Sequence, residues 1–225
     1  MLRLILSAIL LCTMSSSYAS ITLGATRVIY EGGKKEASIS LGNKGDEIPY
    51  LIQSWVTKFD DTNKNTPFVI TPPLFKLPSE TENLIRISYV REVLPQDRES
   101  LFALNINAIP AIDKKEQSRI LIATKSVLKL IYRPAALSNK EAATAYEKVT
   151  AMRTKDAIRL HNPTPYYINI GMFKVDDKAL KNVGYIAPFS DKVITGANNN
   201  ARNITLKAIN DYGGLTTGKI VNIQG

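Results

Sequence analysis

Few side chains of this sequence could perform catalysis or bind a metal ion. The only histidine is His161, and the only cysteine, Cys12, lies near the N-terminus. One histidine cannot build a histidine-rich metal site, and a Ser-His-Asp triad would have to use His161 itself. His161 precedes Asn162-Pro163 at an expected strand end, so we interpret it as a surface side chain.

The acidic pairs of the sequence do not indicate an active site either. Asp60-Asp61 and Asp176-Asp177 lie in polar, turn-like stretches, which predicts solvated loops rather than acid/base catalysis. Glycine-rich dinucleotide motifs and phosphate-loop motifs are absent. We therefore predict that the protein is not an enzyme and that it holds no cofactor and no metal.

Residues 1–19 have the three parts of a secretory signal peptide. Arg3 is the basic residue, an apolar run follows from Leu4 to Cys12, and Ala19 stands directly before the cleavage site. The apolar run is too short to span a bilayer. We predict an exported mature chain that begins at Ser20 and has no cysteine, so no disulfide can form within it.

The chain is basic, with a formal net charge of +9 at pH 7. Such a balance is typical of proteins that bind nucleic acid, anionic membranes or acidic partners. The lysines are scattered, however, and no block of five or more like charges occurs. We interpret the charge as a solvated surface with some electrostatic steering, and export argues against nucleic acid as a partner.

The elements that must position any site are predicted to be short strands. From residue 20 to about residue 134, β-type runs alternate with turn signals, and long helical periodicity is almost absent. This number of runs is about that of an immunoglobulin-like sandwich. The predicted strands are Thr26–Tyr30, Glu36–Leu41, Tyr50–Val56, Phe68–Thr71, Leu84–Tyr89, Leu101–Ile106 and Ile120–Tyr132.

A break follows Arg133-Pro134, and the polar stretch Ser138–Glu141 suits a linker. Ala142–Lys148 could form one or two helical turns or an exposed connector. A second set of short strands is then predicted at Ala157–Leu160, Tyr166–Phe173, Val183–Ile186, Lys192–Ile194, Arg202–Ile209 and Lys219–Ile223. The predicted fold class is all-β, with two immunoglobulin-like β-sandwich domains in tandem, at residues 20–137 and 138–225.

Six motifs in this order resemble the periplasmic pilus chaperones of the PapD-like, chaperone–usher family. They are Thr26–Tyr30 (TRVIY), Pro49–Val56 (PYLIQSWV), Leu94–Phe102 (LPQDRESLF), Lys129–Ala136 (KLIYRPAA), Asn162–Tyr167 (NPTPYY) and Ile209–Gly214 (INDYGG). The resemblance covers nearly the whole chain after the signal peptide. It implies a periplasmic chaperone that binds, folds and caps pilus subunits and delivers them to an outer-membrane usher.

The resemblance also implies roles for particular residues. Arg27 and Lys129 would lie in an inter-domain cleft and hold the C-terminal carboxylate of a subunit, because two cations in a partly desolvated cleft form charge-assisted hydrogen bonds with a chain terminus. Ile120, Ile122 and Thr124 would be the alternate residues of an edge strand that is donated to the subunit. A plain core strand is the alternative for this segment.

Three further residues, Glu99, Arg133 and Asp211, match the inter-domain ion network of the family, which fixes the angle between the domains. The segment between Pro110 and Ile120 is short, and the mature chain has no cysteine, so the short-loop branch of the family fits better than the long-loop branch. Self-association of the free protein through its edge strands also stays open.

Other classes of β protein were weighed against this interpretation. A pilus subunit or a two-domain adhesin would be a structural protein, but subunits usually have a single incomplete sandwich and often a disulfide. A periplasmic carbohydrate-binding sandwich would need exposed aromatic rings, and we expect Trp55, the only tryptophan, to belong to the core of an alternating strand. A periplasmic hydrolase lacks candidate catalytic residues.

Overall fold

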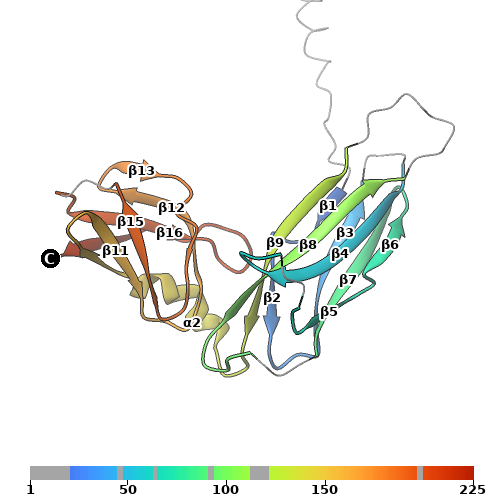
Figure 1. The fold of residues 1–225 in the computed structure, drawn as a ribbon, viewed down its shortest axis with the longest axis horizontal. Helices are drawn as coiled ribbons and strands as arrows, with labels where there is room; N and C mark the ends of the chain where they lie inside the picture. Colours follow the sequence, from blue (N-terminus) through green and yellow to red (C-terminus); the bar gives the residue numbers. More distant parts are fainter. Residues whose placement is uncertain (1–20, 45–47, 63–64, 91–93, 112–121, 197–199) are drawn as a thin grey trace, which may run out of the picture.

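The structure is a computed structural model that describes residues 21–44, 48–62, 65–90, 94–111, 122–196 and 200–225. The predicted signal peptide, residues 1–19, lies outside the described residues. Within those described ranges no helix is long and apolar enough to cross a membrane. The chain forms two β-rich domains joined where β9 ends (Figure 1), which confirms the predicted all-β fold class of two immunoglobulin-like sandwiches in tandem.

The first domain is a sandwich of two sheets. One sheet has the strand order β1-β3-β7-β5 and the other has the order β2-β9-β8-β4-β6. The strands are β1 (Ile21–Leu23), β2 (Arg27–Glu31), β3 (Glu36–Asn43), β4 (Tyr50–Lys58), β5 (Phe68–Thr71), β6 (Leu74–Leu77), β7 (Thr81–Tyr89), β8 (Ser100–Pro110) and β9 (Thr124–Arg133).

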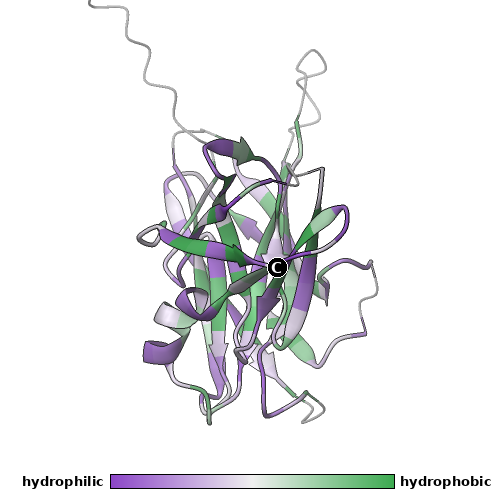
Figure 2. Ribbon diagram, turned by 90° about the vertical axis from the view of Figure 1, so that its left-hand side faces the viewer, coloured by the Kyte–Doolittle hydropathy of each residue, from purple (hydrophilic) through white to green (hydrophobic). Residues whose placement is uncertain are grey.

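Alternation along these strands builds the core between the sheets. Ile52, Leu104 and Leu130 on one sheet and Ile85 and Ile87 on the other are almost completely buried. Because successive side chains of a strand point to opposite faces, their neighbours in sequence lie on the outer faces. Figure 2 shows the resulting alternation of hydrophobic and hydrophilic residues along the strands.

The chain changes sheets between β1 and β2, and this leaves part of β9 without a neighbour. β1 pairs with β3, whereas β2 pairs with β9 in parallel, starting with Arg27 opposite Lys129. At the crossing, the amide of Gly24 donates to the carbonyl of Ser40, and a Cβ on Gly24 would collide with the Ser40 hydroxyl. Among the described residues, the stretch of β9 from Thr124 to Leu128 therefore pairs with β8 alone.

The second domain begins with a short helix whose first turn is capped by Ser138. The Ser138 hydroxyl accepts a hydrogen bond from the amide of Lys140, which satisfies one of the free donors of the helix end. The elements are α2 (Asn139–Thr144), a 3-10 helix (Ala145–Lys148), β10 (Thr150–Arg153), β11 (Ala157–Asn162), β12 (Ile168–Val175), β13 (Lys178–Leu180), β14 (Tyr185–Ile186), β15 (Ser190–Thr195), β16 (Asn203–Ala208) and β17 (Lys219–Gln224).

The strands of the second domain form one hydrogen-bonded series around a second core. Its order is β13-β12-β16-β17-β10-β11-β15, and β14 pairs with β12. Leu160, Phe173, Ile204 and Leu206 are almost completely buried inside it. The two domains thus have separate cores, and polar side chains carry much of the contact between them.

Several sequence predictions differ from the structure. The predicted linker Ser138–Glu141 contains the cap and the start of α2, and the strand predicted at Val183–Ile186 is limited to Tyr185–Ile186. Trp55 is not a core residue: it is only partly buried and shares the outer face of β4 with the exposed residues Leu51 and Gln53, while Lys125 lies 5.3 Å from its ring centroid. Among the described residues, the last strand of the first domain begins at Thr124, and Ile122, predicted to belong to this strand, lies before it. Ile120 itself lies outside the described residues.

Candidate functional site

Arg27 and Lys129 lie side by side on parallel strands of the first domain. The register of β2 and β9 pairs the two residues directly. Val28 and Leu130, their neighbours in sequence, are buried in the core, so Arg27 and Lys129 are on the opposite sheet face. This face is turned toward the second domain, which contacts both cations.

Arg27 is buried against the second domain. Its side chain donates a hydrogen bond of 3.3 Å to the carbonyl of Ile209, whereas its Nε is buried without a hydrogen-bond partner. Burial lowers the pKa of Arg27, and the charge of Asp211 opposes this effect. An unpaired buried donor costs about 1–3 kcal/mol. Arg27 can therefore donate one more hydrogen bond to an anionic or polar ligand, and satisfying this donor would lower the free energy of the complex.

Lys129 is held by groups of the second domain and by an aromatic ring of the first. Its Nζ donates a hydrogen bond of 2.5 Å to Oδ1 of Asn169, and it lies 5.4 Å from the ring centroid of Phe59 and 5.1 Å from that of Tyr185. Burial lowers the pKa of Lys129 to about 8; the charge of Arg27 lowers it as well, and Asp60 raises it. The ammonium is thus a partly desolvated cation beside a second cation, an arrangement that attracts anions.

A hydrogen bond between the domains closes over Lys129. The hydroxyl of Tyr185 donates to Oδ2 of Asp60 at 2.6 Å, and the Tyr185 ring lies edge-on to Phe59 and to Tyr167, with centroid distances of 5.7 and 5.6 Å. Burial raises the pKa of Tyr185 to about 12, and the bond to Asp60 adds to the effect. Asp60, predicted to be only a solvated loop residue, is exposed but takes part in an inter-domain contact.

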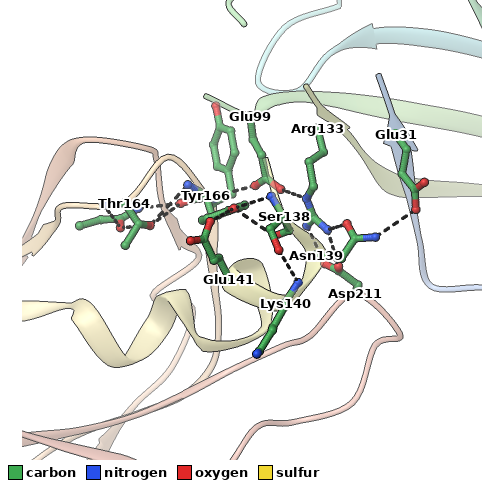
Figure 3. Close-up of polar contacts among 12 residues, drawn as sticks. Glu31, Glu99, Arg133, Ser138, Asn139, Lys140, Glu141, Thr164, Tyr166 and Asp211 are labelled. Atoms are coloured by element: carbon green, nitrogen blue, oxygen red, sulfur yellow. Dashed lines mark hydrogen bonds and ion pairs between the residues drawn. The ribbon is translucent and has the colours of Figure 1, made fainter. Parts of the chain in front are cut away.

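The structure brings Glu99, Arg133 and Asp211 together into one network (Figure 3). Nε of Arg133 donates to Oε1 of Glu99 at 2.7 Å, and two further bonds of 2.8 and 3.1 Å join its guanidinium to the Asp211 carboxylate. The amide of Tyr167 donates to Oε2 of Glu99 at 2.7 Å. The side chains of Arg133 and Glu99 are only 3% and 1% exposed, whereas that of Asp211 is 33% exposed.

Burial and charge act in opposite directions on this network. Burial raises the pKa of Glu99, and the charge of Arg133 only partly offsets it. Burial alone would lower the pKa of Arg133, but its hydrogen bonds and charge interactions with Asp211 and Glu99 raise it overall. Arg133 is therefore the fixed charge on which both acids depend.

The loop that carries Asp211 depends on a glycine. Gly213 has a φ of +89°, which residues with a side chain rarely adopt, and a Cβ at this position would collide with the hydroxyl of Thr26 in the first domain. The loop is closed by hydrogen bonds between Asn210 and Gly214. Glycine thus lets the second domain approach the first closely enough for Asp211 to reach Arg133.

A cavity of about 430 Å³ lies between the domains beside this network. Ile29, Ile131 and Ile168 contribute to its apolar lining, and Asn169 also contacts Lys129. The predicted inter-domain cleft is therefore present as a space beside the ion network. Its lining does not include Arg27 or Lys129 but does include their hydrogen-bond partners Ile209 and Asn169.

The predicted donor residues lie at the free end of β9. Ile122 is 71% exposed and precedes the strand, and Thr124 is exposed and pairs with Ala108 of β8. Thr124 shares its strand face with Leu128 and Leu130, which enter the core. The predicted donor residues Ile122 and Thr124 thus extend the series of core-facing side chains of β9 beyond the buried part of the sandwich.

His161 takes no part in the cleft. It is exposed on β11, and its Nδ1 lies 2.7 Å from Oδ1 of Asp191. Among the residues that the structure describes, no group of three or more histidine, cysteine, aspartate or glutamate side chains is placed to hold a metal ion.

The fold and the site place this protein in a structural class: two immunoglobulin-like sandwiches in tandem, with a pair of cations between them. The model of the pili and flagellar-assembly chaperone, PapD N-terminal domain, matches residues 20–138, and that of the pili assembly chaperone PapD, C-terminal domain, matches residues 144–220. The chain therefore belongs to the PapD family of pilus-assembly chaperones.

Relatives and solved structures agree with this membership. The chain is 40% identical to the probable fimbrial chaperone protein ElfD of Escherichia coli O157:H7, over 94% of this chain and 91% of the relative. It is 39% identical to the chaperone protein FimC of E. coli K12, over 88% and 82% of the two chains. The E. coli chaperone DraB superposes with a TM-score of 0.78 at 32% identity, covering 90% of this chain and 98% of DraB.

A structure of the Salmonella enterica SafA pilin in complex with the SafB chaperone also contains a similar chain. It has a TM-score of 0.79 and 29% identity, and the match covers 92% of this chain and 98% of that one.

Several residues of the cleft were missed by the sequence analysis. Asn169 stands between two isoleucines in a strand, which predicts an outward polar residue, yet the contact with the first domain buries it to 4% exposure. Asn139 accepts a bond from Arg133 and donates to Glu31, and Tyr185 covers Lys129. Only Asn139 had a signal in the sequence, since it is a polar residue next to the predicted domain junction.

Proposed function

We propose that this protein binds pilus subunits in its inter-domain cleft, holds their C-terminal carboxylate between Arg27 and Lys129, and donates the edge of β9 to them. In this way it folds and caps subunits in the periplasm and then delivers them to an outer-membrane usher. The proposal assigns residues 1–19 to a cleavable signal peptide, residues 20–137 to the strand-donating domain and residues 138–225 to the second domain. It describes binding rather than catalysis, without a cofactor.

The observation that carries the proposal is the pairing of the two cations. Arg27 has a buried Nε without a hydrogen-bond partner, and Lys129 is partly desolvated next to it. A carboxylate supplies two acceptor oxygens, which suits two adjacent donors that belong to different side chains. Membership in the family and the pilin named with the SafB chaperone support a pilus subunit as the source of this carboxylate.

The strand arrangement supports a particular direction for the bound chain. β2 pairs with β9 only from Lys129 onward, so the edge of β9 at Thr124–Leu128 is left for a bound strand. This strand would be collinear with β2 and would precede it along the edge of β9. With its C-terminus at Arg27 and Lys129, this strand would run parallel to β9. The backbone of β9 then supplies the hydrogen bonds, and Ile122 and Thr124, with Ile120 before them, supply the side chains.

A free edge of this kind also favours pairing with a second copy of the chain. We therefore include self-association of the free protein as part of the proposal, with the subunit as the competing partner for the same edge. The short-loop branch of the family stays a prediction, because the loop between Pro110 and Ile122 lies mostly outside the described residues.

Co-purification tests the proposal. The tagged protein is secreted together with individual pilus subunits, and we expect the wild type to retain at least one of them. Arg27→Ala and Lys129→Ala should lose this subunit while circular dichroism and the melting temperature show a folded protein. Lys178→Ala, an exposed lysine of β13, is the control for the change of charge. Retention of the subunit by both cleft variants at wild-type yield would refute the carboxylate site.

A further inference from the structure

The contact between Asp60 and Tyr185 joins the domains directly over Lys129. Asp60 follows β4 in the first domain, and Tyr185 lies on β14 in the second. Their hydrogen bond of 2.6 Å is among the shortest between the domains, and the Tyr185 ring that it fixes lies 5.1 Å from the Lys129 ammonium. We call Asp60 and Tyr185 the clasp.

The clasp acts on Lys129 in two separate ways. The first is geometric, because the Tyr185 ring and Phe59 together enclose the ammonium, while Asn169 accepts one of its three hydrogens. The second is electrostatic, because the carboxylate of Asp60 opposes the effects of burial and of Arg27 on the charge of Lys129. Burial of Lys129 would otherwise favour the neutral amine, which cannot pair with a carboxylate.

Charged and titratable groups reach this place from several elements. Among the described residues they are Arg27 from β2, Asp60 from the loop after β4, Tyr167 before β12, Tyr185 from β14 and Lys192 from β15, which lies 6.0 Å from the Tyr185 ring. Arg27 is the cation among them that lowers the pKa of Lys129. Asp60 is the one whose charge is found to raise the pKa of Lys129.

We propose that Asp60 and Tyr185 are positioning residues for carboxylate recognition: the Asp60 carboxylate fixes the Tyr185 hydroxyl, and this bond holds the second domain over the Lys129 ammonium. This inference rests on the proposed function, since it concerns the same cleft. It adds that the affinity for a chain terminus depends on a residue pair that does not touch the carboxylate. Both domains therefore contribute residues to the site, Asp60 from the first domain and Tyr185 from the second.

Two conservative variants separate the two effects. In Asp60→Asn, the amide oxygen still accepts the Tyr185 hydroxyl but the charge is lost. In Tyr185→Phe, the ring and the Asp60 charge remain but the hydrogen bond is lost. Asp177→Asn, in the exposed turn between β12 and β13, is the matched control. It removes the same charge at the end of β12 opposite to Asn169, the residue that pairs with Tyr185.

The probe is a 15-residue peptide (about the length that spans the cleft and the β9 edge) with the C-terminal sequence of a retained subunit, made both as free acid and as amide. Affinity is measured by fluorescence anisotropy from pH 6 to pH 10. The wild type should bind the free acid more tightly, and this preference should weaken as the pH rises through about 8 and Lys129 loses its charge. Asp60→Asn should match the wild type at pH 6, but its preference should weaken at a lower pH than in the wild type, because the charge that raises the pKa of Lys129 is gone. Tyr185→Phe should bind about fivefold more weakly at every pH.

The outcomes distinguish this inference from the proposed function. If the wild type does not prefer the free acid, the carboxylate site itself is refuted. If the wild type prefers the free acid but Asp60→Asn follows the pH profile of Asp177→Asn, Asp60 does not tune Lys129 and the clasp is refuted. Wild-type affinity in Tyr185→Phe would also contradict it. A purely structural role would change the melting temperature without shifting the pH profile.

Discussion

Replacement of Arg133 by methionine should destabilise the first domain strongly, because it leaves Glu99 buried without its cation. The Glu99 side chain is 1% exposed and would keep only the hydrogen bond from the Tyr167 amide. Removing one partner of a buried ion pair costs about 3–5 kcal/mol. Asp211→Asn should cost much less, about 1 kcal/mol or below, because Asp211 is one-third exposed and water replaces part of its interaction.

Equilibrium unfolding in urea measures this difference. Trp55 is the only tryptophan and lies in the first domain, so its fluorescence reports on the domain that holds Glu99. The double variant Glu99→Gln/Arg133→Met should recover much of the loss, since the neutral amide still accepts the Tyr167 hydrogen and no charge stays buried.

The pH dependence supplies a second check on the same variant. Burial already raises the pKa of Glu99 in the wild type, and loss of Arg133 raises it further. A carboxyl group whose pKa is higher in the folded state than in the unfolded state stabilises the fold as the pH falls. The cost of Arg133→Met should therefore shrink in acid. A cost below about 1 kcal/mol, or a double variant less stable than Arg133→Met alone, would contradict the role of the pair.

Three further predictions follow from other parts of the structure. Ile122→Ser should weaken subunit retention with little change in melting temperature, because Ile122 is 71% exposed. Leu130→Ser, at a buried position, should unfold the domain. A large loss of stability in Ile122→Ser would show that Ile122 is a core residue. Gly213→Ala should lower the melting temperature more than Gly196→Ala, because both glycines have positive φ but only Gly213 abuts the first domain; equal losses would argue against that contact. The affinity for a subunit should fall as the pH rises through about 8, because Lys129 loses its charge. Titration calorimetry should show that Lys129→Arg abolishes this fall, since arginine stays charged. An unchanged fall in Lys129→Arg would assign the pH dependence to another group.

The fold could be predicted from the sequence because strand alternation is local information. The alternation predicts a strand over Tyr50–Val56, and β4 runs from Tyr50 to Lys58. Trp55 was placed on the wrong face because Leu51 and Trp55 are apolar on the outer face while Ser54 points inward. When both faces of a strand carry apolar residues, alternation alone no longer tells which face enters the core.

The site could be predicted less fully, since it depends on contacts between distant segments. The adjacency of Arg27 and Lys129 follows from a parallel pairing of β2 and β9, for which their spacing in sequence gives no signal. Only the resemblance to a known family placed these two residues together. Asp60 and Tyr185 belong to no such motif, and their contact requires the relative position of the two domains.

The central claim is that the paired cations bind a chain terminus. The most direct test compares a subunit's C-terminal peptide as free acid and as amide, and measures the affinity of each for the wild type and for Lys129→Met. A charge-assisted hydrogen bond contributes about 1.5–3 kcal/mol, so amidation should weaken wild-type binding roughly tenfold or more near neutral pH. In Lys129→Met the preference for the free acid should be much smaller, because only Arg27 then remains to bind the carboxylate. An undiminished preference for the free acid in Lys129→Met would show that the carboxylate is recognised elsewhere.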